Sequence, residues 1–258
     1  MITPPVNRFK ARLKAGEVQL GLWMSVPSPV TAEALSLVGF DWLMFDSEHA
    51  AVEVAGMQPL FQAAAAGESS IVARPAWNDK VLVKKLLDIG AQTLLVPFVQ
   101  SAEEATAAVR ATRFPPDGIR GVAGATRASR FGLAAGYLQQ ANAQVCTLVQ
   151  IETRDALDRL EEIAAVDGVD GIFIGPSDLS ASLGHLGNPA AAAVQAELRA
   201  APGRILAAGS VPGILATSAE AAAEYLSWGY RFVAVASDIG LLLRAARESL
   251  AAVTAAAR

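Results

Sequence analysis

Several polar side chains that could carry out chemistry stand directly after short apolar runs of the sequence. They are Asp46-Ser47-Glu48-His49, Arg74, Gln150 with Glu152, and Ser177 with Asp178. Carboxylates suit a hard divalent cation such as Mg²⁺ or Mn²⁺, with Co²⁺ as a further candidate, and arginine binds oxyanions. We therefore predict a site where a metal and an arginine hold charge on an oxygen while a base moves a proton.

The base has few candidates, because the chain contains only two histidines, His49 and His185. His49 lies beside Asp46 and Glu48, and a neighbouring carboxylate would raise its pKa and fix its tautomer, as a general base requires. His185 lies in the glycine-rich segment Leu183–Gly187, for which we expect a structural role. We predict His49 as the base.

Glu152 and Asp178 follow successive apolar runs, which would place their carboxylates side by side as metal ligands. Other interpretations stay open, since Asp178 could cap the helix after Gly175 and Glu152 could pair with Arg154. Arg74 could clamp an oxyanion, or it could form a buried ion pair with one of the same carboxylates.

Other mechanisms lack the residues that they need. None of the five lysines ends an apolar run, so a Schiff-base lysine has no candidate, and no Gly-x-Ser-x-Gly motif occurs. The single cysteine, Cys146, cannot form an intramolecular disulfide, and its apolar surroundings favour a buried, unreactive thiol. The remaining residues suit enolate chemistry.

These residues must be positioned by an alternation of short apolar runs and segments of helical spacing, which is typical of parallel strands covered by crossover helices. Eight strands are expected, at Gln19–Met24, Trp42–Asp46, Ser70–Arg74, Thr93–Pro97, Val145–Ile151, Gly171–Gly175, Arg204–Ala208 and Phe232–Ala236. This predicts an α/β fold, a (β/α)₈ TIM barrel, as a single domain over residues 1–258. A doubly wound open sheet is the alternative, but its Gly-x-Gly-x-x-Gly turn is absent.

Helices are expected at Val30–Val38, Val54–Ala65, Lys80–Ile89, Ala102–Thr112, Arg154–Ala164, Ala190–Ala200, Ala219–Trp228 and Leu241 to about Ala257. The active site of such a barrel lies at the carboxyl ends of its strands, where the polar residues stand. One long segment, Phe98–Gln144, holds a helix and a loop with Arg113, Arg120, Arg127 and Arg130. This loop could contact an anionic ligand or be a solvated surface.

Composition narrows the class of protein. Apolar residues make up 53% of the 258 residues and charged residues 18%, with a net charge of -4, so neither a disordered chain nor a nucleic-acid binder is expected. Two prolines interrupt Met1–Pro5 where a signal peptide would be apolar, and no 18-residue apolar run occurs. We expect a soluble cytoplasmic protein without membrane association.

The segments Asp46–His49, Arg74-Pro75, Pro115–Gly121, Gln150–Thr153 and Ile174–Leu179 resemble, in order, signature segments of the 4-hydroxy-2-oxoheptanedioate aldolase family, the class II pyruvate aldolases. The resemblance extends from about Asn7 to the last helix. It implies a (β/α)₈ barrel assembled as a homo-hexamer, a trimer of dimers with the terminal helix exchanged. It also implies a carbon–carbon lyase that reversibly cleaves 4-hydroxy-2-oxo acids into pyruvate, or a related 2-oxo acid such as hydroxypyruvate, and an aldehyde.

The same resemblance assigns the metal and substrate contacts. Glu152 and Asp178 would bind the metal, and the 2-oxo acid would chelate it. The backbone N–H groups of Ser177 and Asp178 would receive the substrate carboxylate, as a helix N-terminus favours for any anion. Gln150 would touch the substrate, and Arg74 would stabilise the enolate.

The resemblance implies the base as well. His49 would act on the 4-hydroxyl through a metal-bound water. Asp88 matches the acidic partner that raises the basicity of this histidine in the family, although its place in the sequence would not by itself single it out.

Two departures from the family pattern bear on specificity. Met44-Phe45-Asp46-Ser47 stands where Ile or Leu and a glycine are expected. The apolar segment Gly209–Ile214 is expected to follow strand seven and line the aldehyde pocket, which would favour uncharged aldehydes over a semialdehyde.

Two other functions are weighed against the aldolase. A CoA-ester lyase of the citrate-lyase β type would share the barrel, the carboxylates and the arginine, but it would need a basic groove for the CoA phosphates. A non-catalytic 2-oxo-acid-binding barrel would keep the fold without the chemistry. The complete set of base, arginine and metal ligands favours catalysis.

Overall fold

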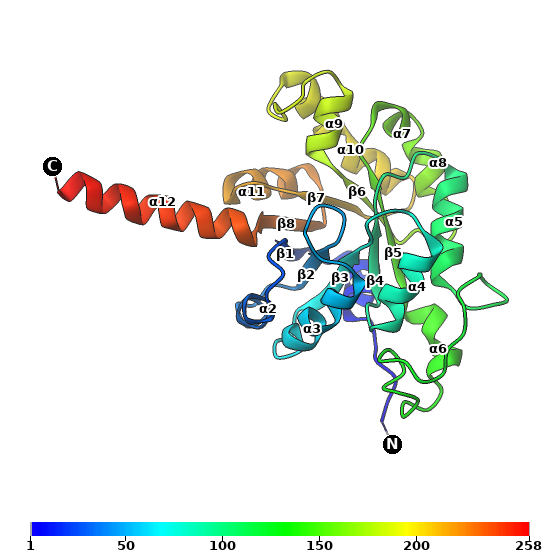
Figure 1. The fold of residues 1–258 in the computed structure, drawn as a ribbon. Coiled ribbons are helices and arrows are strands. Elements are labelled where there is room, and N and C mark those ends of the chain that lie inside the picture. Colours follow the sequence, from blue (N-terminus) through cyan, green and yellow to red (C-terminus); the bar gives the residue numbers. More distant parts are fainter. Residues whose placement is uncertain (1, 258) are drawn as a thin grey trace.

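The computed structural model describes residues 2–257 and contains a closed barrel of eight parallel strands in the order of the sequence (Figure 1). The strands are β1 (Gln19–Met24), β2 (Trp42–Asp46), β3 (Ser70–Arg74), β4 (Thr93–Val96), β5 (Cys146–Ile151), β6 (Gly171–Ile174), β7 (Pro212–Leu215) and β8 (Phe232–Ser237). β8 pairs with β1, so the sheet has no free edge. The predicted TIM barrel is confirmed.

Helices surround this barrel and leave the strand ends open to the loops (Figure 1). They are α2 (Pro29–Ser36), α3 (Val54–Ala64), α4 (Lys80–Asp88), α5 (Ala102–Thr112), α7 (Arg154–Asp158), α8 (Leu160–Ala164), α9 (Pro176–Ser182), α10 (Ala192–Ala207), α11 (Ala219–Trp228) and α12 (Asp238–Ala256). The predicted helix over Arg154–Ala164 is divided into α7 and α8 at Arg159. Two short helices, α1 (Arg8–Lys14) and α6 (Tyr137–Gln144), lack a clear periodic signal in the sequence.

The prediction for strand seven was wrong. Residues Arg204–Ala208 form the end of α10 and its C-cap, and the strand is Pro212–Leu215 instead. A short apolar run is compatible with a buried helix as well as with a strand, because both can be continuously apolar. The segment Gly209–Ile214 therefore leads into β7 and forms its first part. It does not follow the strand, so the expectation that it lines an aldehyde pocket beyond strand seven was wrong.

Large side chains fill the inside of the barrel. Trp42, Phe173 and Phe232 are buried there together with Phe9 from α1. Gly21 of β1 makes this possible, because a Cβ at this position would lie 2.1 Å from the ring of Trp42. Phe9 contacts the rings of Trp42 and Phe232 edge-on, so α1 closes the barrel at the amino ends of the strands.

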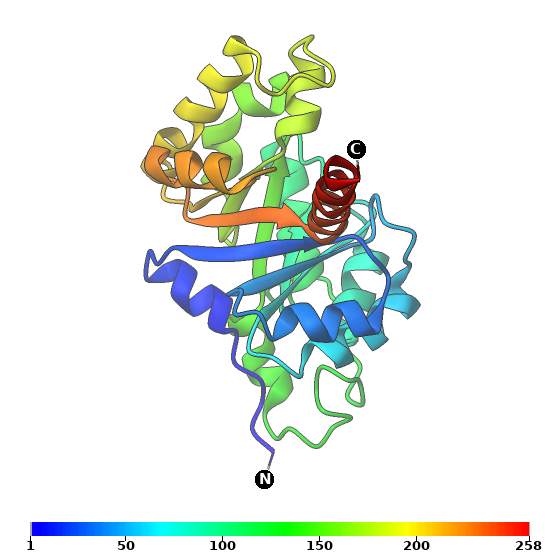
Figure 2. The same ribbon diagram turned by 90° about the vertical axis from the view of Figure 1, so that its left-hand side faces the viewer.

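The last helix stands apart from the rest of the chain. α12 projects away from the barrel in Figure 1 and is seen nearly end-on in Figure 2. Its direction is set at its first residue, where the buried carboxylate of Asp238 accepts hydrogen bonds from the N–H groups of Ser25 and Val26, each at 2.9 Å. Within residues 2–257, no helix is both long and apolar enough to cross a membrane.

Candidate active site

Arg74 is the most strongly held side chain at the carboxyl ends of the strands. Its Nε donates to Asp46 Oδ1 at 2.9 Å and its Nη2 to Asp46 Oδ2 at 2.7 Å, while its Nη1 lies 2.7 Å from Glu48 Oε2. Burial raises the pKa of Asp46, but the hydrogen bonds and charge of Arg74 outweigh this effect and lower that pKa overall. Arg74 thus forms a buried ion pair, with Asp46 and Glu48 rather than with Glu152 or Asp178 as its partners, and its Nη1 also lies 3.4 Å from Gln150 Oε1.

Trp23, at the end of β1, completes the support of this arginine. Its indole N–H donates to Asp46 Oδ2 at 3.3 Å, and the guanidinium of Arg74 lies 4.6 Å from the centre of the indole ring. Trp23 was missed in the sequence, although inspecting the end of strand one as well as strands two to six would have found it. A tryptophan face and a bidentate carboxylate together fix the plane of the guanidinium.

Glu152 is buried at the end of β5 and both of its oxygens are held. Oε1 accepts from the N–H of Phe98 at 2.9 Å, and Oε2 accepts from Gln150 Nε2 at 2.6 Å. Phe98 has a left-handed backbone with φ of 52°, which is uncommon for a residue with a side chain. No sequence signal marks this conformation. Because Gln150 also faces Arg74, it bridges the arginine and the carboxylate.

Glu152 and Asp178 leave adjacent strands, as predicted, because β5 pairs with β6 and Ile151 is opposite Ile174. Gly175 lies between them, and a Cβ there would stand 2.6 Å from Glu152 Oε2. The absence of a side chain at this position therefore keeps space beside the carboxylate.

The alternative roles for these two carboxylates are not observed. Asp178 lies in the first turn of α9, whose N-cap is Gly175 without a side-chain cap. Arg154 pairs with Glu197 at 2.8 Å rather than with Glu152. Ser177 and Asp178 are exposed, and as first-turn residues their N–H groups have no partner within the helix.

Several carboxylates lie close together at the carboxyl ends of the strands. Burial, the charge of Asp178 and the charge of Glu48 raise the pKa of Glu152 to about 7. Burial also raises the pKa of Glu48, with Asp46 and Asp178 adding to the rise. The positive charge of Arg74 lowers the pKa of both Glu48 and Glu152, but both pKa values remain raised overall. The positive charge of Arg74 therefore does not balance the negative charge of these carboxylates.

His49 follows β2 at the same end of the barrel and is exposed. The neighbouring Asp46 carboxylate receives the N–H of Glu48 at 2.9 Å and that of His49 at 3.5 Å, so it binds the backbone of this turn. Within residues 2–257, no carboxylate forms an ion pair with the imidazole. The expected carboxylate that fixes the tautomer of His49 is thus not seen inside one chain.

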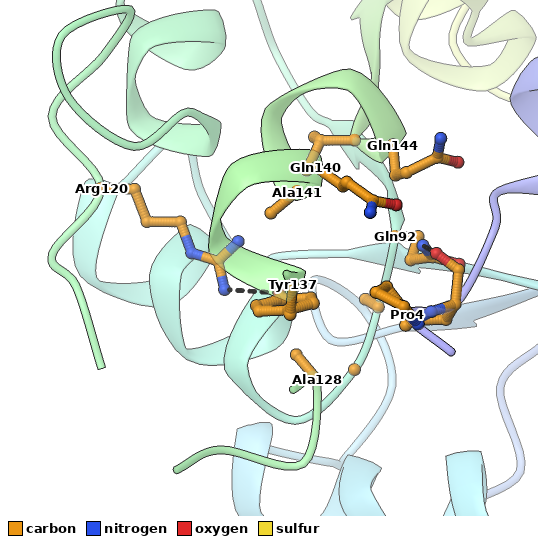
Figure 3. A pocket seen from close by; sticks show the side chains of 12 residues that line it. Pro4, Gln92, Arg120, Ala128, Tyr137, Gln140, Ala141 and Gln144 are labelled. Carbon is orange, nitrogen blue, oxygen red and sulfur yellow. Dashed lines mark hydrogen bonds between the residues drawn. The ribbon is translucent and has the colours of Figure 1, made fainter. Parts of the chain in front are cut away.

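Asp88 lies at the other end of the barrel. It is the last residue of α4, which runs from the end of β3 back towards the start of β4, and its Oδ1 accepts from Arg120 Nη2 at 2.7 Å. Arg120 also points towards Tyr137, with its Nη2 3.5 Å from the phenol oxygen (Figure 3). Both side chains line a small pocket, together with Gln92. One chain therefore does not bring Asp88 to His49.

The remaining residues considered in the sequence are Cys146 and His185. Cys146 is buried at the start of β5, and burial raises the pKa of its thiol well above the ordinary value, in agreement with an unreactive residue. His185 follows α9, with its N–H bonded to the carbonyl oxygen of Ser180.

The residues present fit a hard divalent cation. Glu152 and Asp178 provide carboxylate oxygens on either side of Gly175, which has no side chain to fill the space beside Glu152. The negative charges of these neighbouring carboxylates repel each other, and a bound cation would relieve this repulsion. Within residues 2–257, no group of three or more His, Cys, Asp or Glu side chains is arranged to hold a metal. Mg²⁺ commonly binds one or two carboxylates and takes its other ligands from substrate and water.

The fold and the site together define a class: a (β/α)₈ barrel with an arginine, a histidine and paired carboxylates at the carboxyl ends of its strands. A sequence profile of the HpcH/HpaI aldolase/citrate lyase family matches residues 19–245. The chain belongs to this family.

Individual relatives agree over nearly the whole chain. A pyruvate aldolase of Rhizobium etli is 52% identical over 96% of this chain and 97% of its own length. A 4-hydroxy-2-oxo-heptane-1,7-dioate aldolase of Klebsiella pneumoniae is 55% identical over 95% of this chain and 93% of its own length. The crystal structure of an HpcH/HpaI aldolase/citrate lyase family protein from Burkholderia cenocepacia is 43% identical, with a TM-score of 0.94 over 96% of this chain and all 100% of that chain.

Proposed function

We propose that this protein is a divalent-metal-dependent aldolase that reversibly cleaves 4-hydroxy-2-oxo acids into an aldehyde and pyruvate, or a related 2-oxo acid such as hydroxypyruvate. The observation that carries the proposal is the pair of carboxylates, Glu152 and Asp178, on adjacent strand ends beside a guanidinium that is fixed on three sides. The close relatives are named as aldolases.

In this proposal, Glu152 and Asp178 hold Mg²⁺ or Mn²⁺. When bound, the cation supplies positive charge that polarises the 2-oxo group of the substrate. The N–H groups of Ser177 and Asp178, in the first turn of α9, receive the substrate carboxylate. Gln150 touches the substrate, and its contacts with both Arg74 and Glu152 support this role.

His49 takes the proton from the 4-hydroxyl group. The bond between C3 and C4 then breaks, its electrons move into the 2-oxo group, and the aldehyde leaves. Arg74 donates a hydrogen bond to the resulting enolate oxygen, and a proton added at C3 gives the 2-oxo acid. Pre-organisation of Arg74 by Asp46, Glu48 and Trp23 supports this role, because a fixed donor needs no reorganisation during the reaction.

The test is cleavage of a 4-hydroxy-2-oxo acid with Mn²⁺ or Mg²⁺ present, measured as pyruvate release. Glu152→Gln and Asp178→Asn should each lower the rate by about 10³-fold, the loss expected for several kcal/mol of charge stabilisation. Glu162→Gln, an exposed residue of α8, serves as the matched control and should cleave at the normal rate. Undiminished turnover in excess EDTA would contradict the proposal.

A CoA-ester lyase remains the second candidate function, but it would need a basic groove for the CoA phosphates near the carboxylates. The four arginines of the Arg113–Arg130 loop could form a basic groove, but Arg120 is bound to Asp88 at the end of the barrel opposite the carboxylates. A non-catalytic 2-oxo-acid-binding barrel would bind pyruvate without activating it. Proton exchange at the pyruvate methyl group in D₂O, followed by NMR, distinguishes this function from the aldolase.

We also propose that the protein assembles as a homo-hexamer in which α12 is exchanged between subunits. Only Asp238 of this helix is buried, and the exposed apolar residues Ile239, Leu243, Leu250 and Val253 recur at intervals of four, seven and three residues, which places them on one face of the helix. Such a stripe marks a helix face that packs against another surface. A role for Asp88 at His49 also requires a second copy, because one chain keeps the two residues at opposite ends of the barrel.

A further inference from the structure

A pocket of about 280 Å³ lies at the amino ends of the strands, away from the proposed catalytic site. Arg8, Arg127 and Arg130 line it, together with Ser70 at the start of β3 and Gly90 after α4. No aspartate or glutamate among residues 2–257 lines it. The protein as a whole carries a net charge of -4, so this pocket concentrates positive charge on an acidic molecule.

Arg127 is built into the floor of this pocket. Its Nη1 donates to the carbonyl oxygen of Ile89 at 2.7 Å and its Nη2 lies 3.5 Å from that of Phe61. Gly90 has a left-handed φ of 105°, and a Cβ there would lie 2.5 Å from Arg127 Nη1, so a glycine leaves room for the guanidinium. The carbonyl oxygens at the ends of α3 and α4 orient this arginine and carry only partial negative charge.

The other two arginines carry charge that has little compensation. Arg130 follows Arg127 closely enough for their charges to repel, and no carboxylate among residues 2–257 pairs with either. The backbone of Arg130 is itself left-handed, with φ of 53°. Arg8 donates from Nη2 to the carbonyl oxygen of Glu68 at 2.7 Å, and its Nη1 lies 3.8 Å from the carboxylate of the same, nearly fully exposed residue. Such an exposed ion pair contributes little, so the charge of Arg8 is only weakly compensated.

Like charges gathered in a concave surface without counter-charges are the usual arrangement for binding an anion. The pocket adjoins the smaller one in Figure 3, and the two share Pro5, Gly90, Gln92 and Ala128. Its volume is close to the lower bound for small-molecule sites.

We infer that this pocket binds a small dianionic metabolite, through oxyanion contacts to Arg130, Arg127 and Arg8. The doubly charged group is a phosphate ester or a dicarboxylate, both of which offer several oxygens to forked guanidinium donors. Within one chain, the pocket lies at the amino ends of the strands and the proposed metal ligands lie at the carboxyl ends, so this anion site is separate from the aldol site of the same chain.

The test is calorimetric titration of the full-length protein with inorganic phosphate at constant ionic strength, with malonate in a second series. Arg130→Gln should weaken binding about tenfold, as expected when one charged hydrogen-bonding group is lost. Arg8→Gln is an independent second variant. Arg159→Gln removes an exposed arginine that does not line the pocket, and it should bind within twofold of the unaltered protein.

Tighter binding of phosphate than of malonate would support the inference and assign the ligand to phosphate esters, and the reverse would assign it to dicarboxylates. Equal affinity of Arg130→Gln, Arg8→Gln and the unaltered protein would overturn the inference, because the anion would then occupy another site. Absence of binding by both anions would overturn it as well. Neither result bears on the aldolase activity, which is measured separately as pyruvate release.

Discussion

Individual side chains at the carboxyl ends of the strands differ in how firmly they are held. Arg74 and Glu152 are buried and each is fixed by several partners, whereas His49 and Asp178 are exposed. In the proposed reaction, the two buried groups set the geometry of the site, and the two accessible groups are the ones that would meet the substrate and the metal. This division explains why substitution of an exposed residue should affect activity without affecting the fold.

Replacement of His49 by alanine should lower the rate of aldol cleavage by roughly 10²–10⁴-fold, the range for loss of one acid–base group. Because His49 is exposed, the variant should unfold at the same temperature as the unaltered protein. His185→Ala is the matched control, since it removes the only other histidine, and it should retain full activity. Near-normal cleavage by His49→Ala would exclude it as the base.

The raised pKa of Glu152 makes the metal-free protein sensitive to pH. A carboxyl group whose pKa is raised on folding stabilises the folded state fully at pH values below the unfolded pKa, and this contribution is lost as pH rises through the folded value of about 7. The loss between pH 5 and pH 8 is about 3 kcal/mol at most. Glu152→Gln stays neutral and should be spared this loss.

Urea unfolding in EDTA at pH 5 and pH 8 measures the effect as the difference between the two proteins. The Glu152→Gln variant should gain stability relative to the unaltered protein as the pH rises. If the difference between them stayed constant over this range, Glu152 would not be the group that titrates.

At the scale of the elements, parallel strands bring distant residues to one end of the barrel, and glycines let the strands approach the side chains inside. Gly21 in β1 faces Trp42 in β2, and Gly213 in β7 faces Phe232 in β8. At both positions an added Cβ would lie 2.1 Å from an aromatic ring carbon. The barrel interior is therefore intolerant of an extra methyl group in these strands.

Gly21→Ala should destabilise the protein by at least about 1–3 kcal/mol, the usual cost of overpacking a core. Gly203→Ala is the matched control, because Gly203 lies within α10 and a Cβ there would meet no atom within 4 Å. This control should gain about 0.5–1 kcal/mol from the better helix propensity of alanine. Both values come from urea unfolding, and equal stability of the two variants would show that the ring of Trp42 can move.

At the scale of the whole molecule, α12 is the element whose apolar face is left largely exposed, because only Asp238 of this helix is buried. At 1.5 Å per residue, its 19 residues extend for roughly 28 Å. An exposed apolar stripe of this length is unfavourable in water unless another surface covers it. Exchange of the helix with a second copy would cover it.

Leu250→Asp should disrupt this assembly, since it places a charge in the middle of the stripe. Light scattering after gel filtration should show a smaller species than the unaltered protein forms. Ala252→Asp introduces the same charge on the opposite side of the helix and should leave the assembly unchanged. A monomeric unaltered protein, or a Leu250→Asp variant of unchanged mass, would contradict the proposed exchange.

The sequence by itself determined the architecture and named most residues of the candidate site. The alternation of apolar runs and helical segments predicts the barrel. Because the active site of a barrel lies at the carboxyl ends of its strands, polar residues that follow apolar runs can be selected, namely His49, Arg74, Glu152 and Asp178. Both inferences depend only on local spacing in the sequence. Strand seven was misplaced for the same reason, since a short apolar run has no distinguishing period.

Only the tertiary structure decided how these residues interact. The bidentate pairing of Arg74 with Asp46, the left-handed Phe98 that binds Glu152, and the distance of Asp88 from His49 arise from contacts between segments far apart in the chain. The arginine pocket is another such case, because Arg8 and Arg130 come together only when the barrel closes. Spacing in sequence carries no information on such contacts.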